Sequence, residues 1–291
     1  MDMKTDRNFR VLTSVLVALM VFAVLPCGTS SAAPLGTIIY QDGFTVDGVD
    51  RQYGLDLDLT MIEGSSMRWA APSGREFASI NGNDVVRAAW GDNKGSVIGA
   101  NLALVGGAVK IEADVMPMGN TAAGNWVAMG FQPGTSPAVY TSAGLWMLFR
   151  GNGGYQIFRA GTSVVLADSG TSSVPGYSPG QVANMSITYD SSTNTATFVI
   201  NGKLILTSPD LGVDFANAAK RPFITTYDGG QHFDNYTVSM EGGTFPSPVS
   251  VLQSPANDAY HVDTQPELSW AIPFPVAEGS TLTFDVYAGS Q

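Results

Sequence analysis

The sequence has very few of the residues that most often carry chemistry. Its 291 residues contain one cysteine, Cys27, and two histidines, His232 and His261. Cys27 lies in an amino-terminal segment that we expect to be removed, so no thiol would remain for a disulfide bond, a nucleophile or a metal site. A zinc site usually needs cysteines or a histidine pair, and a serine hydrolase needs a histidine beside its serine. The sequence supports none of these classes.

Basic residues are also scarce. Lysine and arginine number 14 against 25 aspartates and glutamates, a formal net charge of −11. The segment before Ala33 holds three basic and two acidic residues, so the remaining chain carries 11 basic and 23 acidic residues, a net charge of −12. Nucleic acids and anionic lipid surfaces attract basic patches. We therefore expect no nucleic-acid partner.

Long apolar runs are missing except at the amino terminus. Three basic residues stand among the first ten, residues 11–25 are predominantly apolar, and small residues fill positions 29–33. This pattern is typical of a secretory signal peptide. A transmembrane helix needs roughly 20 apolar residues, and this run is shorter and ends at Pro26. We expect residues 1–32 to be a signal peptide cleaved after Ala32, and the mature chain to be secreted or at the cell surface, without a transmembrane helix.

Cys27 leaves a second interpretation of this segment open. In a bacterial lipoprotein, the cysteine that follows the apolar run is modified with lipid and anchors the protein. Such sites resemble Leu-Ala-Gly-Cys, whereas Pro26 directly precedes Cys27 in this chain. Either interpretation places the protein outside the cytoplasm.

Apolar and polar residues alternate along most of the chain. Residues 108–115 place apolar side chains on one side and lysine, glutamate and aspartate on the other, and residues 183–190 repeat the pattern. Such alternation predicts half-buried β-strands. Residues 195–200 and 203–206 are predicted to follow as strands, joined by Asn201-Gly202, a pair that favours a type I′ hairpin turn. The sequence thus predicts a three-stranded antiparallel meander.

Further short strands are predicted from the same alternation and from frequent turns, since the chain contains 33 glycines. They lie near residues 37–40, 67–70, 84–90, 125–131, 144–150, 154–159, 222–227 and 232–240. Only residues 213–220 suggest a short helix. Many short strands with almost no helix predict an all-β fold of two packed antiparallel sheets.

A proline-rich stretch at residues 244–248 marks a predicted domain boundary. It reads Thr-Phe-Pro-Ser-Pro, and proline restricts the backbone, so the connection would be stiff. We expect residues 33–243 to form one large β domain and residues 249–291 to begin a second unit.

Several segments between residues 35 and 242 share the arrangement of a known superfamily. They are Asp42-Gly43-Phe44 and residues 125–131, 146–153, 189–202 and 233–236. Together they resemble the concanavalin A-like lectin and glucanase superfamily, whose fold is shared with laminin G-like domains. The resemblance implies a two-sheet antiparallel jelly-roll sandwich.

The segment after the proline-rich stretch carries its own pattern at residues 254–257, 266–270 and 283–287. This pattern resembles the opening of a fibronectin type III-like domain. Immunoglobulin-like sandwiches of this kind have about seven strands in roughly 100 residues, and residues 249–291 hold only the first three. We expect a partial fibronectin-like β unit at the C-terminus and further domains of the same polypeptide beyond it, and pairing of this tail with another chain is the alternative.

The superfamily resemblance allows a test for enzyme activity. Glucanases of the superfamily carry Glu-x-Asp-x-(x)-Glu on one strand. Glu112 and Asp114 begin this pattern, but Met116 and Pro117 follow where the second glutamate is expected. A retaining glycosidase needs two carboxyl groups roughly 5–5.5 Å apart. The incomplete set favours a non-catalytic protein and leaves a glycoside hydrolase-like enzyme as the alternative.

Calcium is the metal that the resemblance brings into consideration. Many jelly rolls join their first and last strands through one calcium ion held by oxygen ligands. Asp42 precedes the first turn and Asp234 begins the last strand, so the two carboxylates could converge. The alternative is that Asp42 starts a turn with Gly43 and that Asp234 bonds to the backbone. A structural calcium at Asp42 and Asp234 is thus a hypothesis, and no cofactor is required.

Successive side chains of a strand point to opposite faces, and on the middle strands the tryptophans point away from the expected core face. Trp126 stands on one face of its strand, and Trp146 and Arg150 share the corresponding face of the next. Tryptophan rings stack on sugar rings, and a guanidinium donates to hydroxyl groups. Tyr155 could extend such a platform. These four residues form the predicted site for a polysaccharide or glycan, and packing of the tryptophans in the core or at a sheet edge is the alternative.

The sequence as a whole predicts a secreted, non-catalytic carbohydrate-binding or adhesion module of a larger extracellular protein. A glycoside hydrolase-like enzyme on the same fold is one alternative. A structural spacer of a surface protein is another, because the proline-rich linker and the fibronectin-like tail would suffice for it.

Overall fold

The computed structural model describes residues 36–57, 60–63, 68–70, 75–88, 94–98, 105–118, 125–134, 144–160, 164–170, 172–227, 231–244, 251–254 and 269–271. The chain divides into two compact units, Met1–Ser31 and Ala32–Gln291, and every described residue belongs to the second. The predicted signal peptide and residues 245–248 of the predicted linker lie outside the described residues. Within the described ranges, no helix is long and apolar enough to cross a membrane.

One of the two main sheets contains eight strands. They are β1 Thr37–Asp42, β3 Arg75–Ile80, β4 Asn83–Ala88, β6 Val105–Met116, β11 Ala183–Asp190, β12 Thr195–Ile200, β13 Lys203–Thr207 and β15 His232–Thr244. Their order is β13-β12-β11-β6-β15-β4-β3, and β1 also pairs with β15. All of these strands pair antiparallel.

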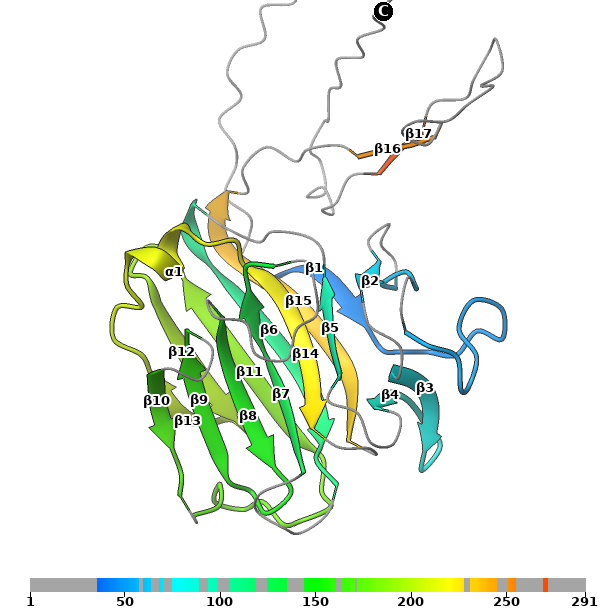
Figure 1. The fold of residues 1–291 in the computed structure, drawn as a ribbon, viewed down its shortest axis with the longest axis horizontal. Coiled ribbons are helices and arrows are strands. Elements are labelled where there is room, and N and C mark those ends of the chain that lie inside the picture. The colour runs from blue at the N-terminus through cyan, green and yellow to red at the C-terminus, as the bar shows by residue number, and fades with distance from the viewer. Residues whose placement is uncertain are drawn as a thin grey trace, which may run out of the picture. The chain divides into compact units, whose positions relative to one another are not determined.

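The other main sheet contains seven antiparallel strands. They are β2 Trp69–Ala70, β5 Lys94–Ile98, β7 Trp126–Gln132, β8 Leu145–Arg150, β9 Tyr155–Arg159, β10 Val164–Asp168 and β14 Arg221–Tyr227. Their order is β10-β9-β8-β7-β14-β5-β2. Figure 1 shows this sheet in front of the eight-stranded one, so the two form the layers of a sandwich.

Three short elements complete the described structure. The helix α1 covers Val213–Asn217, and β16 Val251–Ser254 pairs with β17 Ser269–Ala271 in a two-stranded sheet. The predicted short helix is therefore present but ends earlier than expected. The described part of the tail does not show a fibronectin type III-like unit, which stays a prediction.

The main core lies between the inner faces of the two sheets. On β6 the alternate residues Val109, Ile111, Ala113 and Val115 are all buried in it. On β7 every second residue from Val127 onward, and on β8 every second residue from Leu145 onward, is buried in the same core. The chain is an all-β, two-sheet antiparallel jelly-roll sandwich, and this part of the fold prediction is confirmed.

The predicted meander is present, and its first two strands have the bounds that the alternation gave. β11 and β12 cover residues 183–190 and 195–200, and β13 follows after Asn201-Gly202. Both turn residues have positive φ angles, 50° and 70°. A type I′ turn requires this conformation, which asparagine and glycine tolerate best.

We expect residues 33–243 to fold without residues 244–291, because the main core, among the residues whose side chains the structure describes, lies between Ile39 and Met240. Both versions of the chain should unfold thermally in one cooperative transition at similar temperatures. Calorimetry of the two proteins checks this expectation. Insolubility or a non-cooperative melt of the shorter version would show that the domain boundary is misplaced.

Candidate functional site

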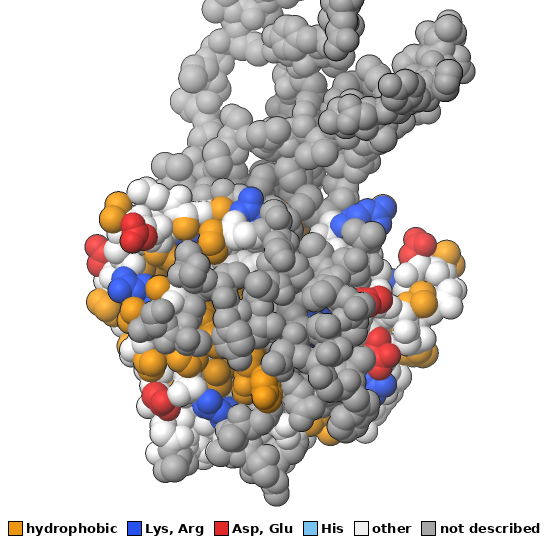
Figure 2. Space-filling model, in the orientation of Figure 1, with side chains coloured by type: hydrophobic (Ala, Val, Ile, Leu, Met, Phe, Trp, Pro, Cys, Tyr) orange, Lys and Arg blue, Asp and Glu red, His pale blue; other side chains and the backbone are white. Residues whose placement is uncertain are grey.

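A second apolar cluster lies on the outer face of the seven-stranded sheet. It consists of Trp126, Ala128, Trp146, Leu148, Phe158 and Phe223. Residues between them on the same strands, such as Val127 and Met147, belong to the main core instead. The predicted division of β7 and β8 into two faces is therefore confirmed. Figure 2 has the orientation of Figure 1, with this sheet in front, and it shows hydrophobic side chains gathered on the face toward the viewer.

Four aromatic rings form a row across this outer face. Tyr227 stacks on Trp126, with ring centroids 5.6 Å apart and an interplanar angle of 22°. Trp126 is tilted against Trp146 at 6.1 Å, and Trp146 stacks on Phe158 at 4.6 Å. The row crosses four neighbouring strands, β14, β7, β8 and β9. Each aromatic pair contributes roughly 0.5–1.5 kcal/mol beyond its buried area, so the row stabilises this part of the sheet.

The exposure of these rings differs along the row. Trp126 and Trp146 are only 5% and 3% exposed, whereas Tyr227 is 37% exposed. A sugar ring can stack only on a ring face that it can reach. The tryptophans therefore pack within the outer-face cluster, which differs from the predicted open platform and also from the alternative of packing in the core or at a sheet edge. Tyr227 is the ring of this row that a ligand can reach.

A chain of polar side chains continues from Trp126 toward the edge of the sheet. Arg150, the cross-strand partner of Trp126, donates from Nη2 to Gln156 Oε1 at 2.6 Å. Gln156 donates in turn from Nε2 to Asp168 Oδ2 at 2.6 Å. The hydrogen bond from Gln156 lowers the pKa of Asp168, and burial lowers the pKa of the Arg150 guanidinium. We call Tyr227, Trp126, Arg150, Gln156 and Asp168 the surface strip.

The surface strip takes one residue from each of five neighbouring strands, β14, β7, β8, β9 and β10. Sequence reasoning identified Trp126 and Arg150 but missed Tyr227, Gln156 and Asp168. The alternation within residues 222–227 and 154–159 carried a signal for the first two. The sequence does not show which residues pair across neighbouring strands. The pairing of Tyr227 with Trp126 places both side chains on the outer face of the sheet, and no pattern within a single strand indicates it.

Tyr155 does not belong to the surface strip. It pairs with Phe149 across β8 and β9 and packs against the main core. Because side chains alternate along a strand, Tyr155 and Gln156 point to opposite faces. The predicted extension of the site by Tyr155 is thus corrected, and Gln156 occupies that place.

Asp42 is fully buried at the centre of a hydrogen-bond network. Its Oδ1 accepts from the backbone N–H of Phe44 and from Arg51 Nη1, both at 2.8 Å. Its Oδ2 accepts from Arg51 Nη2 at 2.9 Å and from Trp69 Nε1 at 2.7 Å. A carboxylate offers about four acceptor positions, so protein donors occupy those of Asp42.

Asp234 lies on the opposite face of the eight-stranded sheet from Asp42. Asp42 pairs with Tyr236, which is in the main core. Asp234 pairs with Asp114 on the outer face, and an irregularity at Asn235, whose φ is 49°, separates Asp234 from Tyr236. The predicted convergence of Asp42 and Asp234 on one calcium ion is therefore corrected. In the described parts of the chain, no group of three or more histidine, cysteine, aspartate or glutamate residues could hold a metal.

The carboxylates of the incomplete glucanase pattern are engaged on that same outer face. Glu112 forms an ion pair with Lys110. Asp114 accepts from Asn184 Nδ2 at 3.1 Å and from Asn235 Nδ2 at 2.9 Å. Such partners are typical of polar residues on a solvated strand face.

Comparison with known proteins gives similarities at low identity. No family model matches the chain, and no curated protein matches it. A carbohydrate-binding module from Bacillus subtilis is 14% identical, with a TM-score of 0.42, and the match covers 60% of this chain and 98% of that one. A protein of unknown function with a galectin-like fold from Bacillus subtilis is 12% identical, with a TM-score of 0.46 and coverage of 74% and 100%. Winged bean acidic lectin in complex with methyl-α-D-galactose is 14% identical, with a TM-score of 0.44 and coverage of 62% and 94%.

Proposed function

We propose that this protein is a carbohydrate-binding module whose ligand lies along the surface strip. The observation that supports this most strongly is the exposed ring of Tyr227, which rests flat on Trp126 in line with Arg150, Gln156 and Asp168. A sugar ring has an apolar face of C–H groups and a rim of hydroxyl groups. The tyrosine ring suits the apolar face, and the polar side chains both donate to hydroxyl groups and accept from them.

The surface strip is held in place before a ligand arrives. Trp126 stacks against the ring of Tyr227 from the neighbouring strand, and the bonds from Arg150 to Gln156 and from Gln156 to Asp168 fix the polar side chains relative to one another. Backbone N–H of Gly170 donates to Asp168 Oδ1 at 2.7 Å. A site that is already ordered loses less conformational entropy when a ligand binds.

The length of the surface strip favours a chain of sugars over a single sugar. Neighbouring strands lie about 4.8 Å apart, so five strands span about 20 Å. We propose that an oligosaccharide or polysaccharide crosses the strands from Tyr227 to Asp168. One stacking contact and a few hydrogen bonds, less the cost of ordering, correspond to a dissociation constant of about 0.1–1 mM.

The wider setting is proposed from the sequence. Residues 1–32 would export the chain, which would then act outside the cytoplasm as a non-catalytic module of a larger extracellular protein. Further domains of the same polypeptide would follow the proline-rich stretch at residues 244–248.

Replacing Tyr227 with alanine is expected to weaken oligosaccharide binding about three- to tenfold, the equivalent of one aromatic stacking contact. Gln156→Ala should weaken it by a similar factor, because it breaks the chain between Arg150 and Asp168. The ligand is first found on a glycan array with the protein displayed in many copies. Calorimetry with the oligosaccharide that binds then measures the affinity of each variant.

Tyr53→Ala is the matched control, because Tyr53 is also an exposed tyrosine but contacts Asp84, on a strand of the other sheet. It should leave binding unchanged. Equal effects of the Tyr53 and Tyr227 substitutions, or no binding to any glycan on the array, would contradict the proposed function.

A further inference from the structure

Three asparagines of the chain are followed directly by glycine: Asn81, Asn152 and Asn201. An asparagine before glycine can lose its side-chain amide without an enzyme, because glycine has no side chain to keep its backbone nitrogen away from the asparagine Cγ. In this reaction the glycine nitrogen forms a bond to Cγ, the bond from Cγ to Nδ2 breaks, and ammonia leaves with the proton of the glycine N–H. Water then opens the cyclic imide to aspartate or to isoaspartate.

Asn81 and Asn201 stand in two hairpin turns with the same local sequence and backbone. Each follows an isoleucine in an Ile-Asn-Gly tripeptide. Each forms a two-residue turn with its glycine, between β3 and β4 in one case and between β12 and β13 in the other. The φ angles are 54° and 87° in the first turn and 50° and 70° in the second, and all four residues are exposed. Local sequence and backbone therefore do not distinguish the two sites.

The hydrogen bonds of the two side chains do distinguish them. Asn201 Oδ1 accepts from the backbone N–H of Asn184, on β11, at 2.9 Å, and the backbone N–H of Asn201 donates to the carbonyl of Asn184 at 2.8 Å. Among the residues that the structure describes, none is hydrogen-bonded to the side chain of Asn81. Because Oδ1 and Cγ belong to one carboxamide group, the bond fixes Cγ of Asn201, whereas Cγ of Asn81 can rotate toward the nitrogen of Gly82.

The third site, Asn152-Gly153, is held at both reacting groups. Asn152 Oδ1 accepts from the backbone N–H of Gly154 at 3.0 Å. The N–H of Gly153, whose nitrogen would have to attack, donates to the carbonyl of Arg150 at 2.8 Å. Gly153 is buried, and a side-chain atom added to it would lie 2.7 Å from Ser173. Neither the carboxamide nor the glycine can move easily into the geometry of attack.

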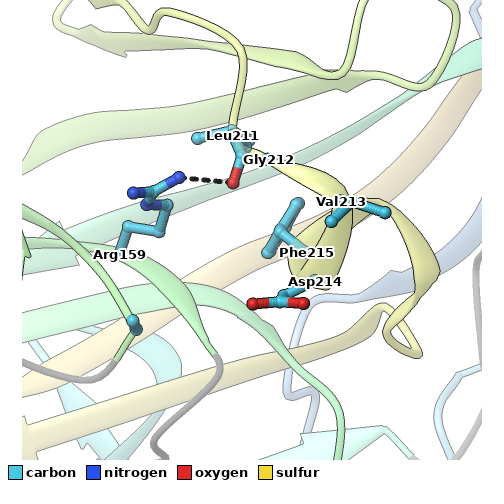
Figure 3. Close-up of a pocket in the computed structure, with 7 residues that line it drawn as sticks. Arg159, Leu211, Gly212, Val213, Asp214 and Phe215 are labelled. Atoms are coloured by element: carbon cyan, nitrogen blue, oxygen red, sulfur yellow. Dashed lines mark hydrogen bonds between the residues drawn. The ribbon is translucent and has the colours of Figure 1, made fainter.

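Asn194 provides an internal reference, because its carboxamide is also engaged. Its Nδ2 donates to Asp210 Oδ1 at 2.5 Å and to the carbonyl of Gly212 at 3.0 Å. Figure 3 shows the end of this loop, in which the carbonyl of Leu211 also accepts from Arg159. A threonine follows Asn194, and its branched side chain restricts the backbone beside the nitrogen. We expect Asn194 to keep its amide.

We propose that Asn81 is a deamidation site of the folded protein and that it reacts faster than Asn201 and Asn152. A side-chain atom added to Gly82 would meet nothing within 4 Å, so no neighbouring group obstructs ring closure there. The site goes beyond the proposed function and does not depend on it, because the reaction needs only the amide, the glycine nitrogen and water.

The products would change the outer face of the eight-stranded sheet. Asn81 lines a cavity of about 150 Å³ together with Asp114 and Asp234, so aspartate at this position would bring a third carboxylate to its walls. Isoaspartate would also insert a methylene group into the backbone of a two-residue turn. That turn leads into Asp84, whose carboxylate accepts from the Tyr53 hydroxyl at 2.7 Å. The reaction therefore takes place next to a contact between the hairpin and the loop that carries Tyr53.

The test is incubation of the purified chain in warm, mildly alkaline buffer, followed by proteolysis and mass spectrometry of the peptides that contain each asparagine. In the folded protein, Asn81 should convert about two- to tenfold faster than Asn201, the effect on a rate of releasing one hydrogen bond. Asn152 and Asn194 should convert more slowly still. In concentrated urea, where these hydrogen bonds are lost, the three asparagines that precede glycine should convert at similar rates.

Asn81→Asp is the control variant, because Asn83 lies in the same turn and the same peptide. Aspartate is tolerated at positive φ, and the variant peptide should gain no further mass during incubation. A mass gain that persists in the variant would assign the reaction to Asn83. Absence of conversion at Asn81 in the folded protein, or conversion of Asn201 or Asn152 at the same rate, would overturn the proposal. A ranking that persists in urea would overturn it too, since the folded structure would not be its cause.

Discussion

Replacing Trp146 with alanine is expected to lower the free energy of unfolding by about 3–5 kcal/mol, the usual cost of deleting a large buried aromatic side chain. Trp146 is buried on the outer face, stacks on Phe158 and contacts Trp126. The substitution would open a cavity in the second cluster and interrupt the aromatic row that leads to Tyr227. Urea denaturation measures the change, provided that the m-value stays constant.

Tyr227→Ala is the matched control for this prediction, because it removes an aromatic ring from the exposed end of the same row. It should cost less than about 1 kcal/mol, as substitutions at exposed positions usually do. If Trp146→Ala also costs less than about 1 kcal/mol, then the tryptophan is not packed in solution. The open tryptophan platform that the sequence suggested would then describe this face better than the surface strip does.

Most of the fold could be predicted because strand alternation is a local property. β11 and β12 have the predicted bounds, and the residues predicted to face the core on β6 do so. β3 was not predicted, although Asn81-Gly82 after it has the same turn conformation, with φ angles of 54° and 87°, as the predicted hairpin. Its first residue, Arg75, is charged yet fully buried, and no local pattern indicates a buried arginine.

The candidate site was harder to predict because it depends on contacts between distant segments. The alternation of side chains along each strand placed Trp126 and Trp146 correctly on the face away from the main core. It could not show that this face carries its own cluster, nor that Tyr227 rather than Tyr155 continues it. For Asp42 the limit was of the same kind, since its partners Arg51 and Trp69 are brought to it only by the folded chain.

The replacement of Arg51 by methionine is expected to cost about 3–5 kcal/mol near pH 7, because it leaves the carboxylate of Asp42 buried without its cation. Arg51 Nη1 and Nη2 donate to both oxygens of Asp42, and Nη1 also donates to Glu63 Oε1 at 3.0 Å. Methionine keeps most of the apolar length of arginine, so lost packing contributes little. The turn at Phe44, whose φ is 52° and whose N–H donates to Asp42, would lose its support.

The pH dependence of this variant distinguishes a buried charge from a packing defect. Burial raises the pKa of Asp42, and the two hydrogen bonds from Arg51 oppose that rise, so the pKa should be higher still in Arg51→Met. A carboxyl group whose pKa is raised by folding costs stability above its folded pKa, and the cost disappears below its unfolded pKa of about 3.9. The deficit of Arg51→Met should therefore shrink as the pH falls from about 7 toward about 4.

Asp42→Asn is the background that isolates this effect, because asparagine carries no charge at any pH. In the Asp42→Asn background, Arg51→Met should lower the free energy of unfolding by an amount that does not depend on the protonation of residue 42. Unfolding in urea at several pH values measures the wild type, the two single variants and the double variant. A deficit that is equal at pH values near 7 and near 4 in the Asp42 background would show that the ion pair is not what stabilises the turn. A loss of stability in Asp42→Asn that appears with calcium and vanishes with EDTA would instead identify Asp42 as a calcium ligand, against the four protein donors that now surround it.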